Sequence, residues 1–382
     1  MLILKKKVER DHSTMKNLFN LFLIMLLVSM PFLSLAANFS ETCEDGSGEP
    51  GSGFGIGFGI VLEFGLYRNS CPEAESVVYS WVETAVLQDP RMAASLLRLH
   101  FHDCFVNASA LILYFRRSLN RDVFCITLQG CDASVLLDDT EGLVGEKTAP
   151  PNLNSLRGFE VIDSIKADLE RVCPETVSCA DILAMAARDS VVVSGGPSWD
   201  VEVGRKDGRT ASKQAATTSL PSPNSTVPTL ISIFQNLGLS QTDMVALSGG
   251  HTLGKAKCTS FTARLQPLQT GQPANHGDNL EFLESLQQLC STVDTSVAIT
   301  QLDLVTPSTF DNQYYVNLLS GEGLLPSDQA LAVQDPGTRE IVETYAADQS
   351  VFFKDFKNAM VKMGGITGGN EGEIRRNCRA VN

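Results

Sequence analysis

The sequence has few basic residues, few strand signals and little apolar sequence of membrane-spanning length. It contains 30 Lys and Arg against 44 Asp and Glu, which gives a net charge of −14. Proteins that bind nucleic acid neutralise phosphates with clustered Lys and Arg, so this composition argues against a nucleic-acid partner. Strand signals are short and scattered, and no internal repeat occurs. Apart from one N-terminal run, no segment is long and apolar enough to cross a membrane.

The N-terminal apolar run has the layout of a secretory signal. Basic residues precede the stretch LFNLFLIMLLVSMPFLSLAA, which ends in small residues. This pattern predicts a signal peptide over residues 1–36. An uncleaved membrane anchor is the alternative, but Asn20, Ser29 and Pro31 interrupt the run. We therefore expect a secreted protein with no stable membrane association after cleavage.

The cysteines and the glycosylation sequons also favour secretion. The chain has ten Cys, and disulfides persist in oxidising compartments. Asn-X-Ser/Thr sequons begin at Asn38, Asn107 and Asn224. Residues 37–65 form a Gly-rich leader whose alternating glycines miss the G-x-G-x-x-G spacing of dinucleotide sites, so we interpret this segment as a linker.

From about residue 66 onward, apolar residues recur at helical spacing. This periodicity predicts one mainly α domain over residues 66–382. The segment DPRMAASLLRLHFHDCF begins with Asp89 as an expected N-cap and Pro90 at the first helical position. Ser240 and Asp243 in LSQTDMVALSGGH resemble a capping box in which Asp replaces Glu.

Four polar residues form a stripe along the helix that DPRM begins. Arg91, Ser95, Arg98 and His102 are separated by four, three and four residues, so they share one face. A buried stripe with two Arg and one His is costly unless an anionic or polar group lies against it. A cofactor that carries carboxylates would meet this need. A solvated helix face is the alternative explanation for Arg91 and Ser95.

The other histidine patterns are weaker signals. His100, His102 and Cys104 are two residues apart, so on a helix their side chains would not converge on one metal ion. Zinc ligands on a helix are spaced by four. His251 stands near the end of a predicted helix in ALSGGHTLGK. On its own, such a histidine is more often a core or capping residue than a ligand. Its combination with His102 favours a functional pair.

Eight motifs occur in the order found in one family, namely RLHFHDCF, GCDASVLLDD, GEKTAPPN, RGFEVID, SCADILAMAARD, ALSGGHTLGK, TPSTFDNQYY and SDQAL. Over residues 66–382 the chain resembles the plant secretory haem peroxidases of class III. The resemblance implies a mainly α fold with few short strands, in which haem b lies between a distal and a proximal helical half. It also implies an enzyme (EC 1.11.1.7) that reduces hydrogen peroxide and oxidises phenolic donors by one-electron steps. Such an enzyme would be a monomer in the extracellular space, the cell wall or the vacuole, with roles in lignin or suberin formation and in the response to oxidative stress.

The resemblance assigns roles around the haem. His251 corresponds to the proximal iron ligand, and Asp328 to the carboxylate that accepts its other ring proton. His102 is similar to the distal base, which takes a proton from hydrogen peroxide and returns it to the leaving oxygen. Arg98 would stabilise the negative charge on that oxygen, and Asn152 would orient His102. The resemblance also implies that Arg91 and Ser95 contact the haem propionates. It implies that Pro221 lies beside the open haem edge, where the donor docks.

Two calcium sites are implied as well, because hard cations prefer oxygen ligands. The distal site would use side chains and carbonyls of Asp103, Val106, Gly130, Asp132 and Ser134, with Glu146 linking it toward the distal histidine. The proximal site would use Thr252, Asp303, Thr306 and Asp311. A helix cap or a surface charge is the alternative for any single Asp among them.

Eight of the ten cysteines fit the framework of the same family. Eight cysteines alone would allow 105 pairings. The resemblance implies the pairs Cys71–Cys173, Cys104–Cys131, Cys179–Cys378 and Cys258–Cys290. Cys43 and Cys125 remain unassigned.

Residues 108–129 interrupt this pattern, because removing these 22 residues restores the uninterrupted motif HFHDCFVNGCDASVLLDD. They separate Val106 from Gly130 and lengthen the ring that a Cys104–Cys131 bond would close, at a cost of about 1–1.5 kcal/mol in chain entropy. The insert also carries the apolar run LILYF, which favours aggregation unless it is covered. We interpret it as a translated intron or gene-model artefact, with a genuine surface excursion as the alternative. An impaired or non-enzymatic cell-wall protein is the competing function.

Overall fold

A computed structural model describes residues 62–106, 130–270, 277–292, 297–367 and 372–382. All of them belong to one of the two compact units of the chain, Gly59–Asn382. The predicted signal peptide, most of the leader and the insertion at 108–129 lie outside the described residues. The same is true of Asn38, Asn107, Cys43 and Cys125.

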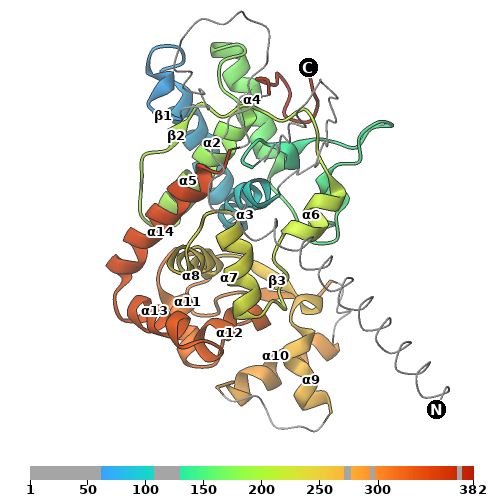
Figure 1. Cartoon of the computed structure of the whole chain (residues 1–382), viewed down its shortest axis with the longest axis vertical. Helices are drawn as coiled ribbons and strands as arrows, with labels where there is room; N and C mark the ends of the chain where they lie inside the picture. Colours follow the sequence, from blue (N-terminus) through green and yellow to red (C-terminus); the bar gives the residue numbers. More distant parts are fainter. Residues whose placement is uncertain (1–61, 107–129, 271–276, 293–296, 368–371) are drawn as a thin grey trace, which may run out of the picture. The chain divides into compact units, whose positions relative to one another are not determined.

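Helices dominate the described chain, as the sequence predicts (Figure 1). They are α2 (Ala74–Gln88), α3 (Arg91–Phe105), α4 (Phe159–Val172), α5 (Cys179–Val193), α6 (Lys213–Ser219), α7 (Val227–Asn236), α8 (Gln241–Ser248), α9 (Thr262–Gln269), α10 (Leu280–Thr292), α11 (Gln313–Leu319), α12 (Pro326–Val333), α13 (Pro336–Ala347) and α14 (Gln349–Gly364). Short 3₁₀ turns are η1 (Leu66–Arg68), η2 (Ser134–Leu136), η3 (Glu146–Thr148), η4 (Gly249–Thr252) and η5 (Cys258–Ser260).

Two small antiparallel ladders account for the named strands of the described chain. In the first, β1 (Glu63–Phe64) pairs with β2 (Glu202–Val203). In the second, β3 (Lys255–Lys257) pairs with β4 (Ile299–Gln301). Residues 63 and 64, which the sequence places at the end of the leader, therefore belong to the folded unit.

Local capping chemistry explains several helix boundaries. The Ser240 hydroxyl accepts the N–H of Asp243, and the Asp243 carboxylate accepts the N–H of Ser240, so the expected capping box begins α8. At the start of α3, Asp89 accepts the N–H of Arg91 at 3.0 Å. Pro90 stands just before the first helical residue, one position earlier than the sequence predicts.

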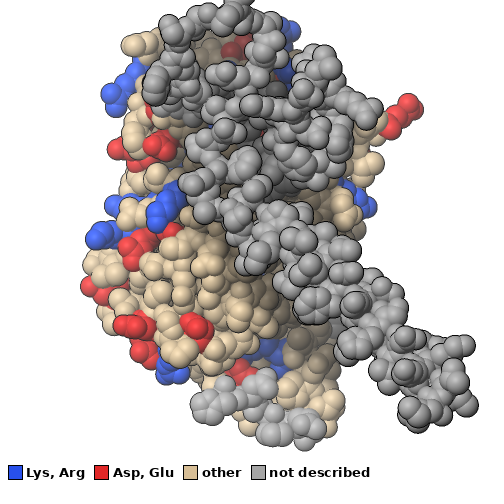
Figure 2. Space-filling model, viewed as in Figure 1, with Lys and Arg blue, Asp and Glu red and all other residues tan. Residues whose placement is uncertain are grey.

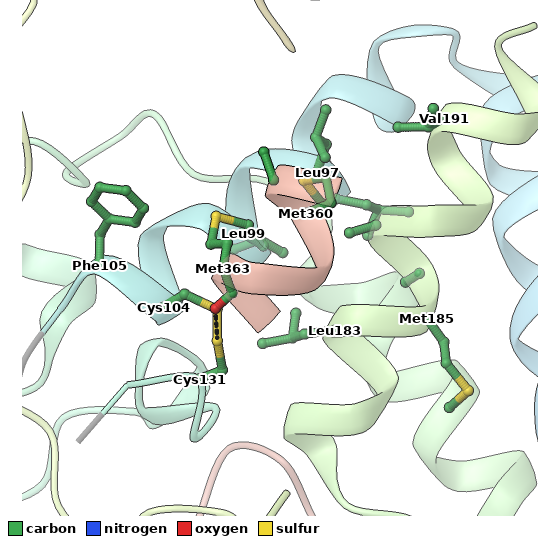
Figure 3. Close-up of a cluster of buried hydrophobic side chains, with 14 of the residues drawn as sticks. Leu97, Leu99, Cys104, Phe105, Cys131, Leu183, Met185, Val191, Met360 and Met363 are labelled. Atoms are coloured by element: carbon green, nitrogen blue, oxygen red, sulfur yellow. Dashed lines mark hydrogen bonds between the residues drawn. A yellow bond between two sulfur atoms is a disulfide. The ribbon is translucent and has the colours of Figure 1, made fainter. Parts of the chain in front are cut away.

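The main hydrophobic core forms where α3, α5 and α14 meet (Figure 3). Leu99 of α3 and Leu183 of α5 are completely buried, and Met363 of α14 lies against them. Residues of α5 are buried on nearly every face, because α2, α3 and α4 all pack around that helix. This central position makes α5 a rigid support for α3, the helix that carries the polar stripe.

A buried polar network ties three distant segments to α5. The Asp181 carboxylate accepts hydrogen bonds from the Tyr67 hydroxyl at 2.6 Å and from the Arg205 guanidinium at 2.9 Å. Arg205 also donates two hydrogen bonds to the carbonyl of Gly364 at the end of α14. Because each buried polar group has a partner, the network stabilises the fold instead of costing the full desolvation energy.

Four disulfides join the described segments. They are Cys71–Cys173, Cys104–Cys131, Cys179–Cys378 and Cys258–Cys290, the pairs that the resemblance implies. The last of these lies in a second hydrophobic cluster, built around α9 and α10.

The surface carries charges of both signs. On the face shown in Figure 2, acidic and basic side chains are interspersed along the left edge, beside a larger uncharged area. None of the described helices is both long enough and apolar enough to cross a membrane.

Candidate active site and cation sites

His102 and Asn152 form the centre of the distal site. Helix α3 presents His102, and the turn after η3 presents Asn152. The Nδ1 atom of His102 lies 2.6 Å from Oδ1 of Asn152, while the Asn152 amide donates to the carbonyl of Glu146 at 2.9 Å. Since that second bond uses the amide N–H, Oδ1 must accept, and the proton of His102 must lie on Nδ1. Nε2 is therefore the basic nitrogen.

Arg98 lies one helical turn before His102. Its Nε donates to Nε2 of His102 at 3.1 Å, and its two terminal nitrogens donate to the carbonyls of Ser155 and Pro151. Burial lowers the pKa of Arg98 to about 10, so the guanidinium is still charged near neutrality. Burial, followed by the charge of Arg98, lowers the pKa of His102 well below its usual value. His102 is thus a neutral base beside a fixed cation.

His251 forms the second imidazole site, in the 3₁₀ turn η4 that follows α8. Its Nδ1 lies 2.8 Å from Oδ1 of Asp328, which also accepts the hydroxyl of Tyr314 at 3.0 Å. Asp328 is positioned by the start of α12, where its other oxygen accepts the N–H of Leu325. Burial lowers the pKa of His251, but the charge and hydrogen bond of Asp328 outweigh it and leave the pKa raised. Nε2 of His251 has no hydrogen-bond partner among the described residues.

The two imidazole sites lie on adjoining elements. A Cβ added to Gly250 would lie 3.5 Å from Leu97, and one added to Gly254 would lie 3.0 Å from Ala94. The segment on either side of His251 therefore runs along the helix that bears Arg98. Arg98 is also near enough for its charge to lower the pKa of His251. The side chain of His251 is 42% exposed, so its ring is accessible to a ligand.

Buried carboxylates gather beside the distal site. Asp103, Asp132 and Glu146 are at most 8% exposed, and each has at least one carboxylate oxygen without a hydrogen-bond partner. Burial and mutual repulsion raise the pKa of Asp103 and of Glu146 well above their ordinary values, and burial raises the pKa of Asp132 to about 6. The Ser134 hydroxyl is likewise buried and unpaired. Buried carboxylates that lack partners fit a hard divalent cation.

The main chains of Val106 and Gly130 belong to the same region. Both residues are buried, and they stand on either side of residues 107–129. The Cys104–Cys131 disulfide, with Cα atoms 4.0 Å apart, brings the two halves of the motif together. The same bond excludes Cys104 as a zinc ligand.

A second group of oxygens lies beyond His251. The hydroxyls of Thr252 and Thr306 both approach Asp311 Oδ1 at 3.2 Å. They lie 3.4 and 3.2 Å from Asp303 Oδ2. The structure thus brings together all four residues expected for a proximal calcium site, and their all-oxygen chemistry suits that ion.

The remaining predicted residues are less closely joined to these groups. Arg91 and Ser95 lie on α3 before Arg98, and the Ser95 hydroxyl donates to the Arg91 carbonyl within the same helix. Neither side chain makes a hydrogen bond to the distal site in the described chain. Pro221 lies in the loop between α6 and α7, and is half-buried.

Comparison with known proteins shows the family of the chain. Residues 78–348 match the peroxidase family. The chain is 82% identical to Peroxidase 40 of Arabidopsis thaliana over 371 residues, which cover 96% of this chain and 100% of that protein. It is 46% identical to Peroxidase 9 of Arabidopsis thaliana, with coverage of 87% and 93%, and 48% identical to Peroxidase 4 of Vitis vinifera, with coverage of 84% and 92%. The chain belongs to the peroxidase family. It is a plant class III peroxidase, and peroxidases of this family use haem.

Some contacts of this candidate site could not be predicted from the sequence. Arg98 is held by the carbonyls of Pro151 and Ser155, and main-chain acceptors give no residue signature. Tyr314 supports Asp328 from α11. Its motif, TPSTFDNQYY, indicates the family but not this contact.

Proposed function

We propose that this peroxidase binds haem b between His102 and His251, reduces hydrogen peroxide and oxidises phenolic donors by one-electron steps. The observation that carries the proposal is the pair of imidazoles on adjoining elements, each with its proton directed to Nδ1. Asn152 accepts the Nδ1 proton of His102, and Asp328 accepts that of His251. Nε2 of His251 therefore offers a free lone pair, whereas the lone pair of His102 Nε2 accepts the Arg98 N–H and would take a proton once that bond is released.

Haem, when bound, would supply the iron that exchanges electrons with peroxide and donor. His251 would hold that iron through Nε2. The hydrogen bond to Asp328 makes the imidazole more basic and orients the ring, as partners of metal-bound histidines commonly do. Arg91 and Ser95 would contact the propionates, and donors would approach beside Pro221.

The distal residues would move one proton and stabilise one charge. His102 Nε2 would take a proton from hydrogen peroxide and return it to the departing oxygen, a role typically worth about 10²–10⁴ in rate. Arg98 carries its charge beside that nitrogen, where it would stabilise negative charge as the O–O bond breaks. Asn152 would keep His102 in the tautomer that this transfer needs.

We also propose two calcium ions. The unpaired oxygens of Asp103, Asp132, Ser134 and Glu146, with the carbonyls of Val106 and Gly130, would hold the distal ion. Thr252, Asp303, Thr306 and Asp311 would hold the proximal one. The distal ion would support catalysis indirectly, because Glu146 contributes a carboxylate to this group and a carbonyl to Asn152.

The N-terminal signal pattern and the disulfides support a secreted protein, located in the extracellular space or cell wall or in the vacuole. We propose that it is a monomer. The exposed loop residue Asn224 is an accessible glycosylation position. Phenolic donors of lignin or suberin chemistry and a role in the oxidative-stress response are the physiological context that we propose.

The two histidine roles can be separated by matched variants. The His102→Gln variant should keep the Soret band but lose at least about a hundredfold in the rate of reaction with peroxide. The His251→Gln variant should lose the native Soret spectrum as well as guaiacol turnover. A His251→Gln protein with native spectrum and turnover would overturn the assignment of the iron ligand. Equal rates for His102→Gln and the parent would overturn that of the base.

A further inference from the structure

One residue of the distal oxygen cluster has an unfavourable backbone conformation. Ala133 stands between Asp132 and Ser134 and has φ 60° and ψ 20°, in the left-handed region. Residues with a Cβ are disfavoured there, so the surrounding structure must hold Ala133 in place. This conformation directs both neighbouring side chains, because it fixes the turn from which they project.

Two buried side chains bond to the backbone of Ala133, one at its N–H and one at its carbonyl. The carboxylate of Asp103, on α3, accepts its N–H at 2.9 Å. The guanidinium of Arg375 donates to its carbonyl at 2.6 Å, although the two residues are 242 positions apart. Arg375 is fully buried, with 0% of its surface exposed.

Arg375 is itself fixed by several bonds. Its N–H is accepted by Asp207 at 2.9 Å, and another guanidinium nitrogen donates to the carbonyl of Cys378 at 3.0 Å. Cys378 is bonded to Cys179 at the start of α5. The guanidinium thus approaches Ala133 from a cross-linked part of the core.

The rest of the C-terminal segment contacts the same loop. The N–H of Cys131 donates to the carbonyl of Ile366 at 2.8 Å, and the N–H of Asp138 donates to that of Arg379 at 2.9 Å. A Cβ on Gly130 would lie 2.3 Å from the Ile366 oxygen, so only glycine permits this approach. In Figure 3, Cys131 likewise lies beside the end of α14, where its sulfur is 3.2 Å from the Met363 carbonyl oxygen.

We propose that Arg375 is a positioning residue for the distal calcium site, and that it acts by holding Ala133 in the left-handed conformation. This inference rests on the proposed distal calcium site. In this proposal, the C-terminal segment shapes loop 130–138 independently of the connection through residues 107–129.

Charge and positioning predict opposite effects when the guanidinium is removed. A cation near the site repels calcium, so at a pH where the carboxylates stay ionised its loss through charge alone would tighten calcium binding. The comparison is therefore made at alkaline pH, because Arg375 also lowers the pKa of Asp103 and Asp132. Loss of positioning would weaken binding, because part of the binding free energy would then be spent on restoring the turn. The sign of the change therefore distinguishes the two roles.

The test uses the full chain carrying Asp303→Asn, which removes a proximal ligand so that the distal ion is followed by itself. Calcium affinity is measured with a competing chelator. We expect Arg375→Met to bind calcium about tenfold more weakly, equivalent to about 1.4 kcal/mol. Adding Ala133→Gly should recover most of that loss, because glycine adopts the left-handed conformation without a Cβ penalty. Ala133→Gly alone should change affinity less than twofold.

Arg376→Met is the matched control, because Arg376 is next in the chain but pairs with Glu175 at the surface. It should leave calcium affinity unchanged. Unchanged or tighter binding in Arg375→Met, or no recovery with glycine, would overturn the role of Arg375. If instead Asp132→Asn does not reduce calcium binding in the same background, the distal site itself is wrong. Should Arg375→Met not fold, Arg375→Lys with and without Ala133→Gly provides the same comparison.

Discussion

The Nδ1 atom of His102 lies 2.6 Å from Oδ1 of Asn152, and this contact determines which imidazole nitrogen carries the proton. Asn152 can accept there only because its amide group donates to the carbonyl of Glu146. The carboxylate of Glu146 belongs to the distal oxygen cluster. The tautomer of His102, which we propose as the base, is thereby coupled through two residues to the group that we propose as a calcium site.

The pH dependence of the reaction with peroxide should reflect the lowered pKa of His102. A base with a lowered pKa stays unprotonated below pH 6.5, so the rate constant should be constant from pH 7 to below pH 6 and fall only in stronger acid. Arg98→Leu should move this acid limb to higher pH, because a nearby cation disfavours protonation. Stopped-flow rate constants measured across this pH range would show the position of the acid limb in the parent and in the variant. Arg98→Lys is the control, since it keeps the charge, and an unmoved limb in Arg98→Leu would contradict the electrostatic explanation.

Asp328→Asn should weaken the hold of His251 on haem iron. The carboxylate accepts bonds from His251, Tyr314 and the N–H of Leu325, and an amide cannot accept all three. We expect a higher iron reduction potential and about 10–100-fold weaker haem retention, the usual scale for partners of metal-bound histidines. Spectroelectrochemical titration and haem transfer to apomyoglobin would measure these changes. Tyr314→Phe removes one bond but no charge, and an effect as large as that of Asp328→Asn would contradict a charge-based role.

The features that could be predicted from the sequence are those with local causes. The capping box of Ser240 and Asp243 depends on residues three positions apart, and the spacing of Arg98 and His102 follows from helix geometry. The oxygen clusters could be predicted only through the resemblance. Each combines segments that are far apart in the chain, such as Thr252 and Asp311.

The contacts that could not be predicted depend on tertiary structure or on main-chain atoms. Nothing near Arg375 in the sequence indicates that it will donate to the carbonyl of Ala133. The left-handed conformation of Ala133 has no sequence signature either, since such positions usually carry glycine. The pairing of β1 with β2 was likewise missed, because a two-residue strand is too short for periodicity to indicate.

Calcium removal should destabilise the protein more at pH 8 than at pH 5. Without a cation, Asp103, Asp132 and Glu146 have raised folded-state pKa values, about 6 for Asp132. A raised carboxylate pKa favours the protonated folded form, so the stability of the calcium-free protein is lost as pH rises through that value. Tm should be compared for calcium-loaded protein and for protein passed over a chelating resin, both with Asp303→Asn. Equal differences in Tm at the two pH values would contradict this linkage.

Deleting residues 108–129 should preserve the distal site, because the described contacts that shape loop 130–138 come from outside the insert. They involve α3, the C-terminal segment, Gly208 and Lys147. We expect unchanged calcium stoichiometry and haem content, and turnover within about twofold of the parent. The connection that must be closed becomes shorter, which removes up to about 1–1.5 kcal/mol of chain entropy cost, so Tm should stay the same or rise. A chain in which Gly and Ser replace the same 22 residues separates length from composition. If the LILYF run causes association, sedimentation should detect it in the parent and in neither variant. A deletion that regains a calcium ion missing from the parent would show that the insert disrupts the site, and the C-terminal contacts would then be insufficient to maintain it.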